Sequence, residues 1–155
     1  MSDFLHALLA QEEELQFDYF TNEDAFELGC IIVKHAKDVL GKGIAVHIEN
    51  GEVPLFTHYM TGTSKDNTYW INAKKNVVRH FGHSSLYVGE KYKAEGTTFK
   101  DGSGLPLEEY QGEGGSFPII VRGQGVVGTV TVSGLAGEED HQVAVDGLRH
   151  YLTRT

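Results

Sequence analysis

The stretch IAVHIENGEVPLFTHYM, residues 44–60, decides the fold because its apolar residues recur with a period of two. This alternation is typical of β-strands, and Asn50 and Gly51 favour a tight type I′ turn because both residue types tolerate a positive φ. We therefore expect a β-hairpin with a two-residue turn. One face would be core, and the other would be a pocket wall, a subunit contact or solvent-exposed sheet. The expected faces are Ile44, Val46, Ile48, Val53 and Leu55, and Ala45, His47, Glu49, Glu52, Phe56 and His58.

Two helices are expected before this hairpin. Residues 3–16 place apolar side chains at roughly helical spacing and leave acidic side chains for solvent, which indicates an amphipathic helix. The next segment, TNEDAFELGCIIVKHAKDVLGKG (residues 21–43), opens with Thr21 and Asp24 at the spacing of a capping box and closes on Gly41. These signals predict a second helix with defined ends.

A third helix is expected after the hairpin, over DNTYWINAKKNVVRHF, residues 66–81. Ser64 or Asp66 would cap its start, and Gly82 stands where a left-handed residue would end it. SSLYVGEKY, residues 84–92, would then form a short helix or a turn. The third helix is expected to bury one stripe, made of Trp70, Ala73, Val77, Val78 and Phe81.

The last part of the chain predicts a second hairpin and a final helix. Residues 93–115 are rich in glycine and poor in apolar residues, as in a long loop or a mobile lid. FPIIVR (117–122) and VVGTVTVS (126–133) read as strands joined by a turn, and EEDHQVAVDGLRHYL (138–152) reads as a helix with acidic residues at its start.

The order of these elements indicates the fold class. Two hairpins interleaved with helices favour an antiparallel sheet in an α+β domain over a parallel, doubly wound sheet. A chain of 155 residues has the length of one such domain, so we expect a single domain over residues 1–155.

Charge and composition exclude several classes of partner. The formal net charge of −9 would repel phosphate backbones and anionic lipid surfaces, so we expect neither nucleic acid nor membrane as a partner. MSDFLHALLAQEEEL (1–15) carries no basic leader and no apolar span, which predicts a cytosolic protein. Cys30 is the only cysteine, so the chain can form no internal disulfide and no multi-cysteine metal site.

RHFGHSSLYV, residues 79–88, is the densest local cluster of chemically capable side chains. A catalytic metal needs at least three ligands, and this stretch offers His80 and His83 on a helical face that Gly82 interrupts. A serine nucleophile needs an oriented base and an oxyanion hole, which the adjacency of His83 and Ser84 does not supply. A helix end followed by a new serine cap explains the same residues without any chemistry.

Two further motifs have structural explanations. GQGVVG, residues 123–128, matches a dinucleotide fingerprint, but a strand follows it where that fingerprint needs a helix, so a hairpin turn is expected. EEDH, residues 138–141, could line a ligand site, although acidic residues at a helix start also have a purely electrostatic explanation.

Three stretches together resemble a known family: YFTNEDAFELG (19–29), DNTYWINAKKNVVRHFGHSSLYVG (66–89) and VTVSGLAGEEDH (130–141). The resemblance is to an uncharacterised family of bacteria and fungi related to GlcG, the heme-binding HbpS and the C-terminal domain of the PduO adenosyltransferase. It covers residues 17–152. The chain departs from the family pattern in INAKK, where Lys74 stands in place of an expected arginine.

The resemblance implies a profilin-like domain with an antiparallel sheet, assembled into symmetric homo-oligomers. Members of the broader group bind heme or carry a heme-degrading label, and a fungal relative is associated with a protein-targeting pathway. A heme-degrading or hydrolytic activity is implied by these labels alone, and the residues themselves require no catalysis.

Two functional hypotheses follow. The first is a binding domain for heme, a related tetrapyrrole or a small acid, because imidazoles make good axial ligands and flat rings need apolar walls. Its candidate cofactor-binding residues are His80, His83 and His141, with Trp70 and Tyr87 as apolar walls. The second is a non-catalytic oligomeric adaptor that docks a protein partner. Convergence of these side chains on a pocket would favour the first hypothesis, and scattering along a subunit contact would favour the second.

Overall fold

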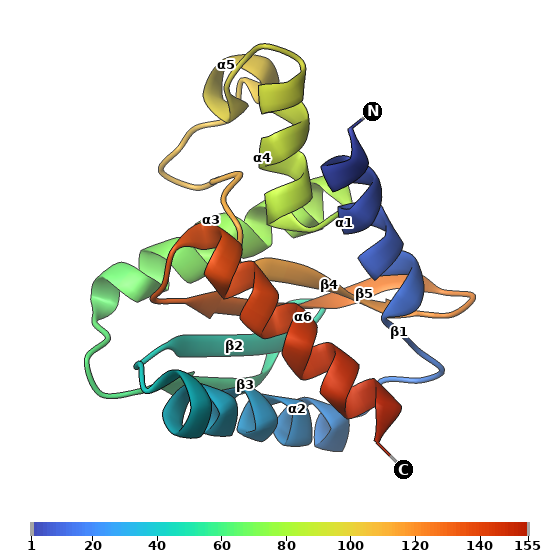
Figure 1. The fold of residues 1–155 in the computed structure, drawn as a ribbon, viewed down its shortest axis with the longest axis vertical. Helices are drawn as coiled ribbons and strands as arrows, with labels where there is room; N and C mark the ends of the chain where they lie inside the picture. The colour runs from blue at the N-terminus through green and yellow to red at the C-terminus, as the bar shows by residue number, and fades with distance from the viewer. Residues whose placement is uncertain (1, 155) are drawn as a thin grey trace.

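The structure of the protein is a computed structural model that describes residues 2–154, so the two terminal residues of the expected domain lie outside the described part. A five-stranded sheet carries helices on both faces (Figure 1). The helical elements are α1 (Asp3–Glu14), α2 (Asn22–His35), the π-helical turn η1 (Ala36–Leu40), α3 (Lys65–Phe81), α4 (Ser85–Ala94), α5 (Phe99–Ser103) and α6 (Gly137–Thr153). The strands are β1 (Gln16–Phe17), β2 (Ala45–Asn50), β3 (Val53–Tyr59), β4 (Ser116–Val121) and β5 (Gly125–Ser133).

The sheet confirms the predicted α+β class. Its strand order is β1-β4-β5-β2-β3. Both hairpins are antiparallel, and β2 joins them by pairing antiparallel with β5 from Ala45 opposite Ser133 to Asn50 opposite Gly128. Only β1 runs parallel to its neighbour, with Gln16 opposite Ile120. β1 was not predicted from the sequence, because its two residues are too few to show a period.

The helices form a layer on each side of the sheet. α2 and α6 pack against each other and cover one face, while α3 lies on the other face against β5, β4 and β2 (Figure 1). α4 packs against both α1 and α3. Within residues 2–154, no helix has the length and apolar character needed to cross a membrane.

The turn of the first hairpin differs from the prediction. β2 extends to Asn50, which pairs with Val53, so the two turn residues are Gly51 and Glu52 and only Gly51 has a positive φ, of 58°. A register shift between Ile48 and Glu49 accompanies this turn. The expected face of Phe56 and His58 was therefore wrong, because a shift of one residue moves side chains to the opposite face, whereas Leu55 packs against the buried core as expected.

The corrected register decides which side chains of β3 are buried. Phe56 pairs with Ile48, contrary to the expected face, and packs over Gly29 of α2. A Cβ on Gly29 would lie 2.4 Å from the Phe56 ring, so this approach depends on glycine. Val53, expected in the core, is 61% exposed.

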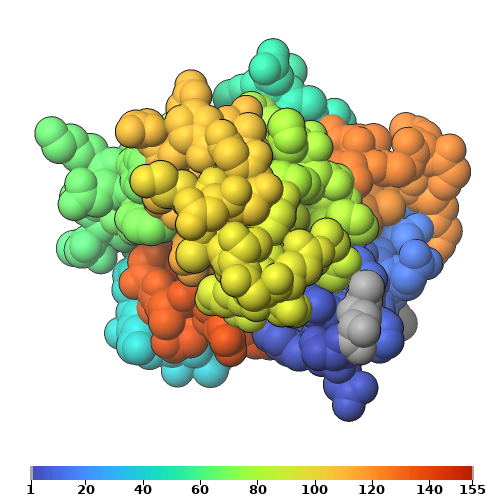
Figure 2. All heavy atoms as spheres, turned by 90° about the horizontal axis from the view of Figure 1, so that it is seen from above, coloured from blue at the N-terminus to red at the C-terminus, as the bar shows by residue number. Residues whose placement is uncertain are grey.

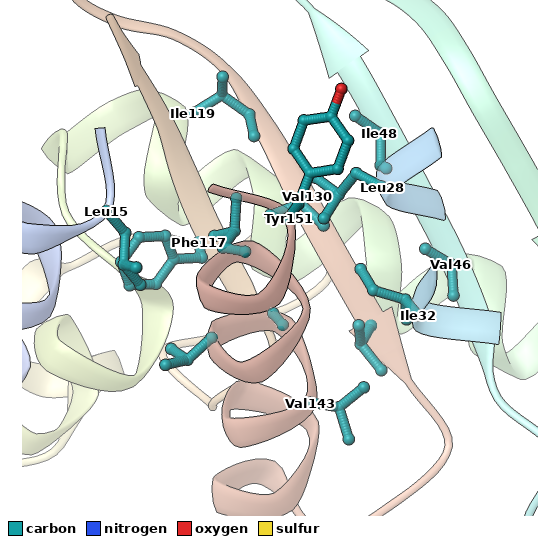
Figure 3. Packing of buried hydrophobic residues seen from close by; sticks show 14 of the residues in the cluster. Leu15, Leu28, Ile32, Val46, Ile48, Phe117, Ile119, Val130, Val143 and Tyr151 are labelled. Atoms are coloured by element: carbon teal, nitrogen blue, oxygen red, sulfur yellow. The ribbon is translucent and has the colours of Figure 1, made fainter. Parts of the chain in front are cut away.

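The main core fills the space between the sheet and the α2–α6 layer (Figure 3). Leu28 and Ile32 of α2 meet Phe117 of β4 and Tyr151 of α6 within one buried cluster. A second cluster lies between α1, α3 and α4 and includes Leu8, Val77 and Tyr87. Burial of such aliphatic and aromatic side chains is the dominant stabilising contribution in a domain of this size.

The helix ends agree with the prediction. Thr21 and Asp24 form the expected capping box, Ser64 caps α3, and Gly82 ends it with a φ of 76°. Ser84 then caps α4, in the segment for which the sequence allowed either a short helix or a turn. Trp70 departs from the expected buried stripe of α3, because 37% of its surface is exposed.

The glycine-rich segment 93–115 contains the end of α4 and the short helix α5 and is otherwise irregular. Figure 2 looks onto this part of the molecule, where α4, α5 and the residues after them cover the middle of the surface beside α1. The segment returns to the sheet past α4, where Gly89 faces Gly112. A Cβ on Gly89 would lie 1.8 Å from the carbonyl oxygen of Gly112.

Gly89→Ala is expected to lower the free energy of unfolding by about 1–3 kcal/mol, because the added methyl group forces two backbone segments apart. Chemical denaturation measures this loss. Lys93→Ala on the exposed side of the same helix is the control and should change stability by less than about 0.5 kcal/mol. Equal stability of the two variants would contradict close packing between α4 and the returning segment.

Candidate ligand-binding cleft

A cleft of about 350 Å³ opens where α3 and α6 begin and β5 ends. Its position follows from the chain path, because β5 ends at Ser133 and the turn at Gly134 leads directly into α6. A φ of 137° at Gly134 makes this sharp turn accessible only to glycine. The cleft is lined by Asp66, Asn67, Trp70, Lys74, Glu113, Gly114, Ser133, Gly134, Leu135, Gly137 and Asp140.

Lys74 forms the floor of the cleft and is 2% exposed. Its Nζ donates to the carbonyl oxygens of Gly114 at 3.1 Å and Val132 at 2.7 Å, and to Asp140 Oδ2 at 3.2 Å. These three acceptors use all three N–H donors of the ammonium group. Lys74 therefore ties α3 to β5, to α6 and to the segment that precedes β4.

Asp140 completes this buried ion pair and fixes the turn before α6. Its Oδ1 accepts a hydrogen bond from the Leu135 N–H at 3.0 Å. Burial raises the pKa of Asp140 to about 6, although Lys74 and the turn amides oppose this change. Burial likewise lowers the pKa of Lys74, against the attraction of Asp140. Desolvation acts against both charges, so each depends on the other for compensation.

The N-termini of two helices line the mouth of the cleft. Asp66 and Asn67, in the first turn of α3, line one side, and Gly137, the first residue of α6, lines the other. α6 has no side-chain cap at Ala136, so its first amides lack a side-chain acceptor there. The uncapped N-terminus of α6 therefore gives the mouth partial positive charge that favours an anion, whereas α3 is already capped by Ser64 and the rim carries the carboxylates of Asp66 and Glu113.

Polar and aromatic side chains complete the lining. Asn67 Nδ2 donates to Ser133 Oγ at 3.0 Å, which leaves the hydroxyl hydrogen of Ser133 available to a ligand. Trp70 supplies an apolar wall, and its ring lies edge-to-face against Tyr69 at a centroid distance of 5.2 Å. The Tyr69 hydroxyl donates to the carbonyl oxygen of Leu107 at 2.6 Å. The aromatic wall is thus held by the segment that follows α5.

Of the five residues predicted to bind a cofactor, Trp70 alone lines this cleft. His80 lies about ten residues, or roughly 15 Å, further along α3, where its ring meets those of Phe81 and Tyr110. Tyr87 is 6% exposed and belongs to the second hydrophobic cluster. These side chains therefore do not converge on one pocket.

His83 lies beside Tyr87, with ring centroids 5.0 Å apart, and faces α1. Its Nδ1 lies 2.8 Å from Glu12 Oε1, and the N–H of Ser84 donates to Glu12 Oε2 at 3.1 Å. Burial raises the pKa of Glu12, while these two contacts lower it. In this arrangement His83 holds α1 against the start of α4.

His141 is a core residue, 2% exposed. Its Nε2 lies 2.8 Å from Gln11 Oε1, and its Nδ1 is buried without a hydrogen-bond partner among the described residues. Burial lowers the pKa of His141 to about 4, so the ring is neutral near pH 7. It packs against Phe117, with ring centroids 5.8 Å apart.

Lys74 and Asn67 were not predicted from the sequence to line a site, whereas Asp140 belongs to EEDH (138–141), which the sequence offered as a possible ligand-site lining beside Ser133. The signal available for Lys74 was its place beside Ala73 on the stripe expected to be buried, since a lysine at a core position needs a partner. Asp140 lies in the acidic first turn of α6, and the acidic residues of this turn were attributed to their favourable interaction with the helix N-terminus. Glu138 and Glu139 fit that explanation because both are exposed, whereas the buried Asp140 has a structural role in the ion pair.

A further buried carboxylate, Glu49 of β2, is held by two cationic side chains of α3. Glu49 is 1% exposed and accepts from Lys75 Nζ at 3.1 Å and from Arg79, and His47 Nε2 lies 2.9 Å away. Burial acts to raise the pKa of Glu49, but these three partners outweigh it and lower the pKa to about 2. Within residues 2–154, no three histidine, cysteine or acidic side chains are arranged to hold a metal ion.

Fold and cleft together define an α+β domain with a five-stranded sheet and a ligand-sized cleft at two helix N-termini. The chain belongs to the family described as haem degrading protein HbpS-like, whose profile matches residues 20–149. A UPF0303 protein of Streptomyces avermitilis is 43% identical over 147 residues, which cover 95% of this chain and 90% of that protein. The resemblance stated from sequence is thereby confirmed.

Solved structures agree with this assignment. The crystal structure of Ybr137w protein is similar with a TM-score of 0.87 and 32% identity, covering 95% of this chain and 86% of that one. The crystal structure of a PduOC:heme complex is similar with a TM-score of 0.70 and 17% identity, covering 84% of this chain and 93% of that one. At the latter identity the likeness establishes a shared fold.

Proposed function

We propose that this protein binds a flat, carboxylate-bearing small molecule in the α3–α6 cleft, with heme or a related tetrapyrrole as the first candidate. The observation that carries the proposal is an aromatic wall, Trp70, beside two helix N-termini in a cleft of about 350 Å³. Pockets of this size lined by apolar groups and a few polar ones are typical ligand sites. Heme is favoured among flat acids by the family description and by the PduOC:heme complex.

The cleft fits the acidic edge of such a ligand. A carboxylate at the mouth would accept hydrogen bonds from the first amides of α6, beginning at Gly137, and from the Ser133 hydroxyl. The flat body would lie against Trp70. Asp66 and Glu113 at the rim oppose a second anion there, so we expect one carboxylate to enter.

The cleft does not fit the iron of heme in the same way, because no imidazole or thiol is among its lining residues. Bound heme would supply a redox-active iron and a large apolar face. In the proposed arrangement the chain binds the acidic edge and the face, and the iron is not coordinated by His80, His83 or His141. Direct coordination by one of these histidines is the competing arrangement within the same proposal.

The fluorescence of Trp70 reports ligand binding, because Trp70 is the only tryptophan of the chain and lines the cleft. Hemin, iron-free protoporphyrin IX and a plain dicarboxylate would each be titrated while the fluorescence of Trp70 is followed. We expect saturable quenching by hemin and protoporphyrin at about one ligand per chain. Quenching that never saturates would overturn the proposal.

Ala136→Asp is the decisive variant, because a carboxylate at the cap of α6 would satisfy the free amides and repel an incoming carboxylate. It should raise the free energy of unfolding by about 0.5–2 kcal/mol and weaken hemin binding at least about tenfold. Ala136→Asn is the matched control, since it caps the helix without charge and should weaken binding less. Equal hemin affinity in Ala136→Asp and the wild type would contradict binding at this helix end.

The histidines are tested by the Soret absorption of bound hemin in His80→Ala, His83→Ala and His141→Ala. The cleft arrangement predicts that all three retain the wild-type spectrum and affinity. Loss of binding in one of them alone, with Ala136→Asp unaffected, would instead identify an axial ligand outside the cleft.

A further inference from the structure

The α3–α6 cleft carries more negative charge than its basic groups neutralise. Among the described residues that line it, Asp66, Glu113 and Asp140 are acidic and Lys74 alone is basic. Asp140 is already paired with Lys74 at 3.2 Å. Asp66 and Glu113 are exposed, and the carboxylate of neither forms a salt bridge or a hydrogen bond within residues 2–154. Two carboxylates at the mouth are therefore available to a cation.

Glu113 lies next to the free amides of α6. A Cβ built on Gly137, the first residue of α6, would be 3.7 Å from Glu113 Oε2. The neighbouring Gly114 packs so tightly on α6 that a Cβ there would be 2.2 Å from the carbonyl oxygen of Gly137. The backbone that carries Glu113 is therefore fixed against the start of α6. A negative group and a helix end with partial positive charge thus lie side by side at the mouth of the cleft.

This juxtaposition restricts the charges that a ligand can carry. A carboxylate that binds the first amides of α6 comes close to Glu113 and is repelled by it, unless the ligand also carries a positive charge. In an α-amino acid a single carbon atom separates the carboxylate from the ammonium group, so its two charges fit two adjoining subsites. The ammonium group has three donors and no acceptor, and an ionised carboxylate only accepts, so the ammonium group and Glu113 match.

Ser133 gives an independent indication that the cleft receives a polar group. Its side chain lines the cleft and is buried, with 3% of the residue exposed. Its Oγ accepts a hydrogen bond from Asn67 Nδ2 at 3.0 Å, and its own hydroxyl hydrogen has no acceptor within residues 2–154. Buried hydroxyl groups normally have their hydrogen-bonding capacity satisfied. A ligand carboxylate at the start of α6 would supply the acceptor.

We propose that the ligand of this cleft is a zwitterion, namely an α-amino acid with an aromatic side chain. Its carboxylate accepts hydrogen bonds from the first amides of α6 and from Ser133, and its ammonium group donates to Glu113, with Asp66 nearby. Its ring lies against Trp70. The inference rests on the proposed function, because it uses the same carboxylate contact, and it adds the requirement for a positive charge on the ligand.

Three compounds that differ only in their charged groups test the proposal. They are phenylalanine, 3-phenylpropionate, which lacks the ammonium group, and phenethylamine, which lacks the carboxylate. We expect phenylalanine to bind at least about tenfold more tightly than either of the others, because each of these loses one charge-assisted contact. Isothermal titration calorimetry measures the three dissociation constants. Equal affinity for phenylalanine and 3-phenylpropionate would overturn the inference and leave the proposed function intact.

Glu113→Gln tests the cation subsite, because it keeps the size of the side chain and removes its charge. It should weaken the binding of phenylalanine about tenfold and leave 3-phenylpropionate bound as tightly as before or slightly more tightly. Glu138→Gln is the matched control, since it removes the same charge from an exposed residue of the first turn of α6 that does not line the cleft. It should change each affinity by less than about twofold, and circular dichroism verifies that both variants are folded.

The competing role for Glu113 is to neutralise the start of α6 itself. In that case Glu113→Gln would tighten the binding of phenylalanine and 3-phenylpropionate by the same factor, which would overturn the inference. Failure of all three compounds to bind would overturn it as well, and the hemin titration then separates the two proposals. Saturable hemin binding would leave the proposed function standing, whereas no binding of hemin or of any of the three compounds would remove both.

Discussion

Replacing Lys74 with methionine is expected to lower the free energy of unfolding by about 3–5 kcal/mol, the cost of breaking a fully buried ion pair. The change removes the donor of three hydrogen bonds at once, to Gly114, Val132 and Asp140. Asp140 would then be a buried carboxylate without its cation, and two carbonyl oxygens would lose their partner. Urea denaturation followed by circular dichroism measures the loss.

Two comparisons make this result specific. Lys100→Met alters an exposed lysine on α5 and should change stability by less than about 0.5 kcal/mol. Adding Asp140→Leu to Lys74→Met should restore part of the loss, because it removes the unpaired charge. Strictly additive effects of the two substitutions would contradict a coupled pair, since coupled neighbours deviate from additivity.

Acidification is expected to remove about 2 kcal/mol of stability through His141 alone between about pH 7.5 and pH 5. The folded state holds the pKa of His141 at about 4, below the value of 6.5 for a free histidine. The unfolded chain therefore takes up the proton first. This contribution is fully present above pH 6.5 and is lost progressively as the pH falls toward 4.

His141→Gln should remove this component, so its stability should fall less steeply with acid than that of the wild type. His150→Gln alters an exposed histidine of the same helix and should leave the pH dependence unchanged. The measurement is the difference between the unfolding free energies at the two pH values for each variant. Parallel curves for His141→Gln and the wild type would show that His141 titrates normally in the folded protein.

The sequence predicted the elements whose signals are local. Thr21 and Asp24 satisfy each other within one turn, and Gly82 ends α3 by its own backbone freedom, so neither depends on distant parts of the chain. The turn of the first hairpin was misplaced for the opposite reason. Its position follows from a register shift next to Glu49, whose side chain is held by Lys75 and Arg79 of α3.

The cleft could be predicted only in small part. Lys74 and Asp140 are 66 residues apart, and each has an ordinary local interpretation, one as a helix lysine and the other as a favourable helix-start charge. Their pairing depends on α3 and α6 meeting at the end of β5. Trp70, which was singled out from the sequence, lines the cleft, but the histidines grouped with it lie elsewhere in the fold.

The pairing of β2 with β5 also determines how the chain can reach its folded state. Ala45 meets Ser133 and Asn50 meets Gly128, so the centre of the sheet unites the two halves of the sequence. Each hairpin can form from neighbouring residues, but this central ladder must wait until a long intervening segment has been brought back. On the ribosome, the sheet can close only after β5 has emerged. Until then the β2–β3 hairpin exposes the unpaired edge of β2, which makes the partly synthesised chain the form most vulnerable to aggregation.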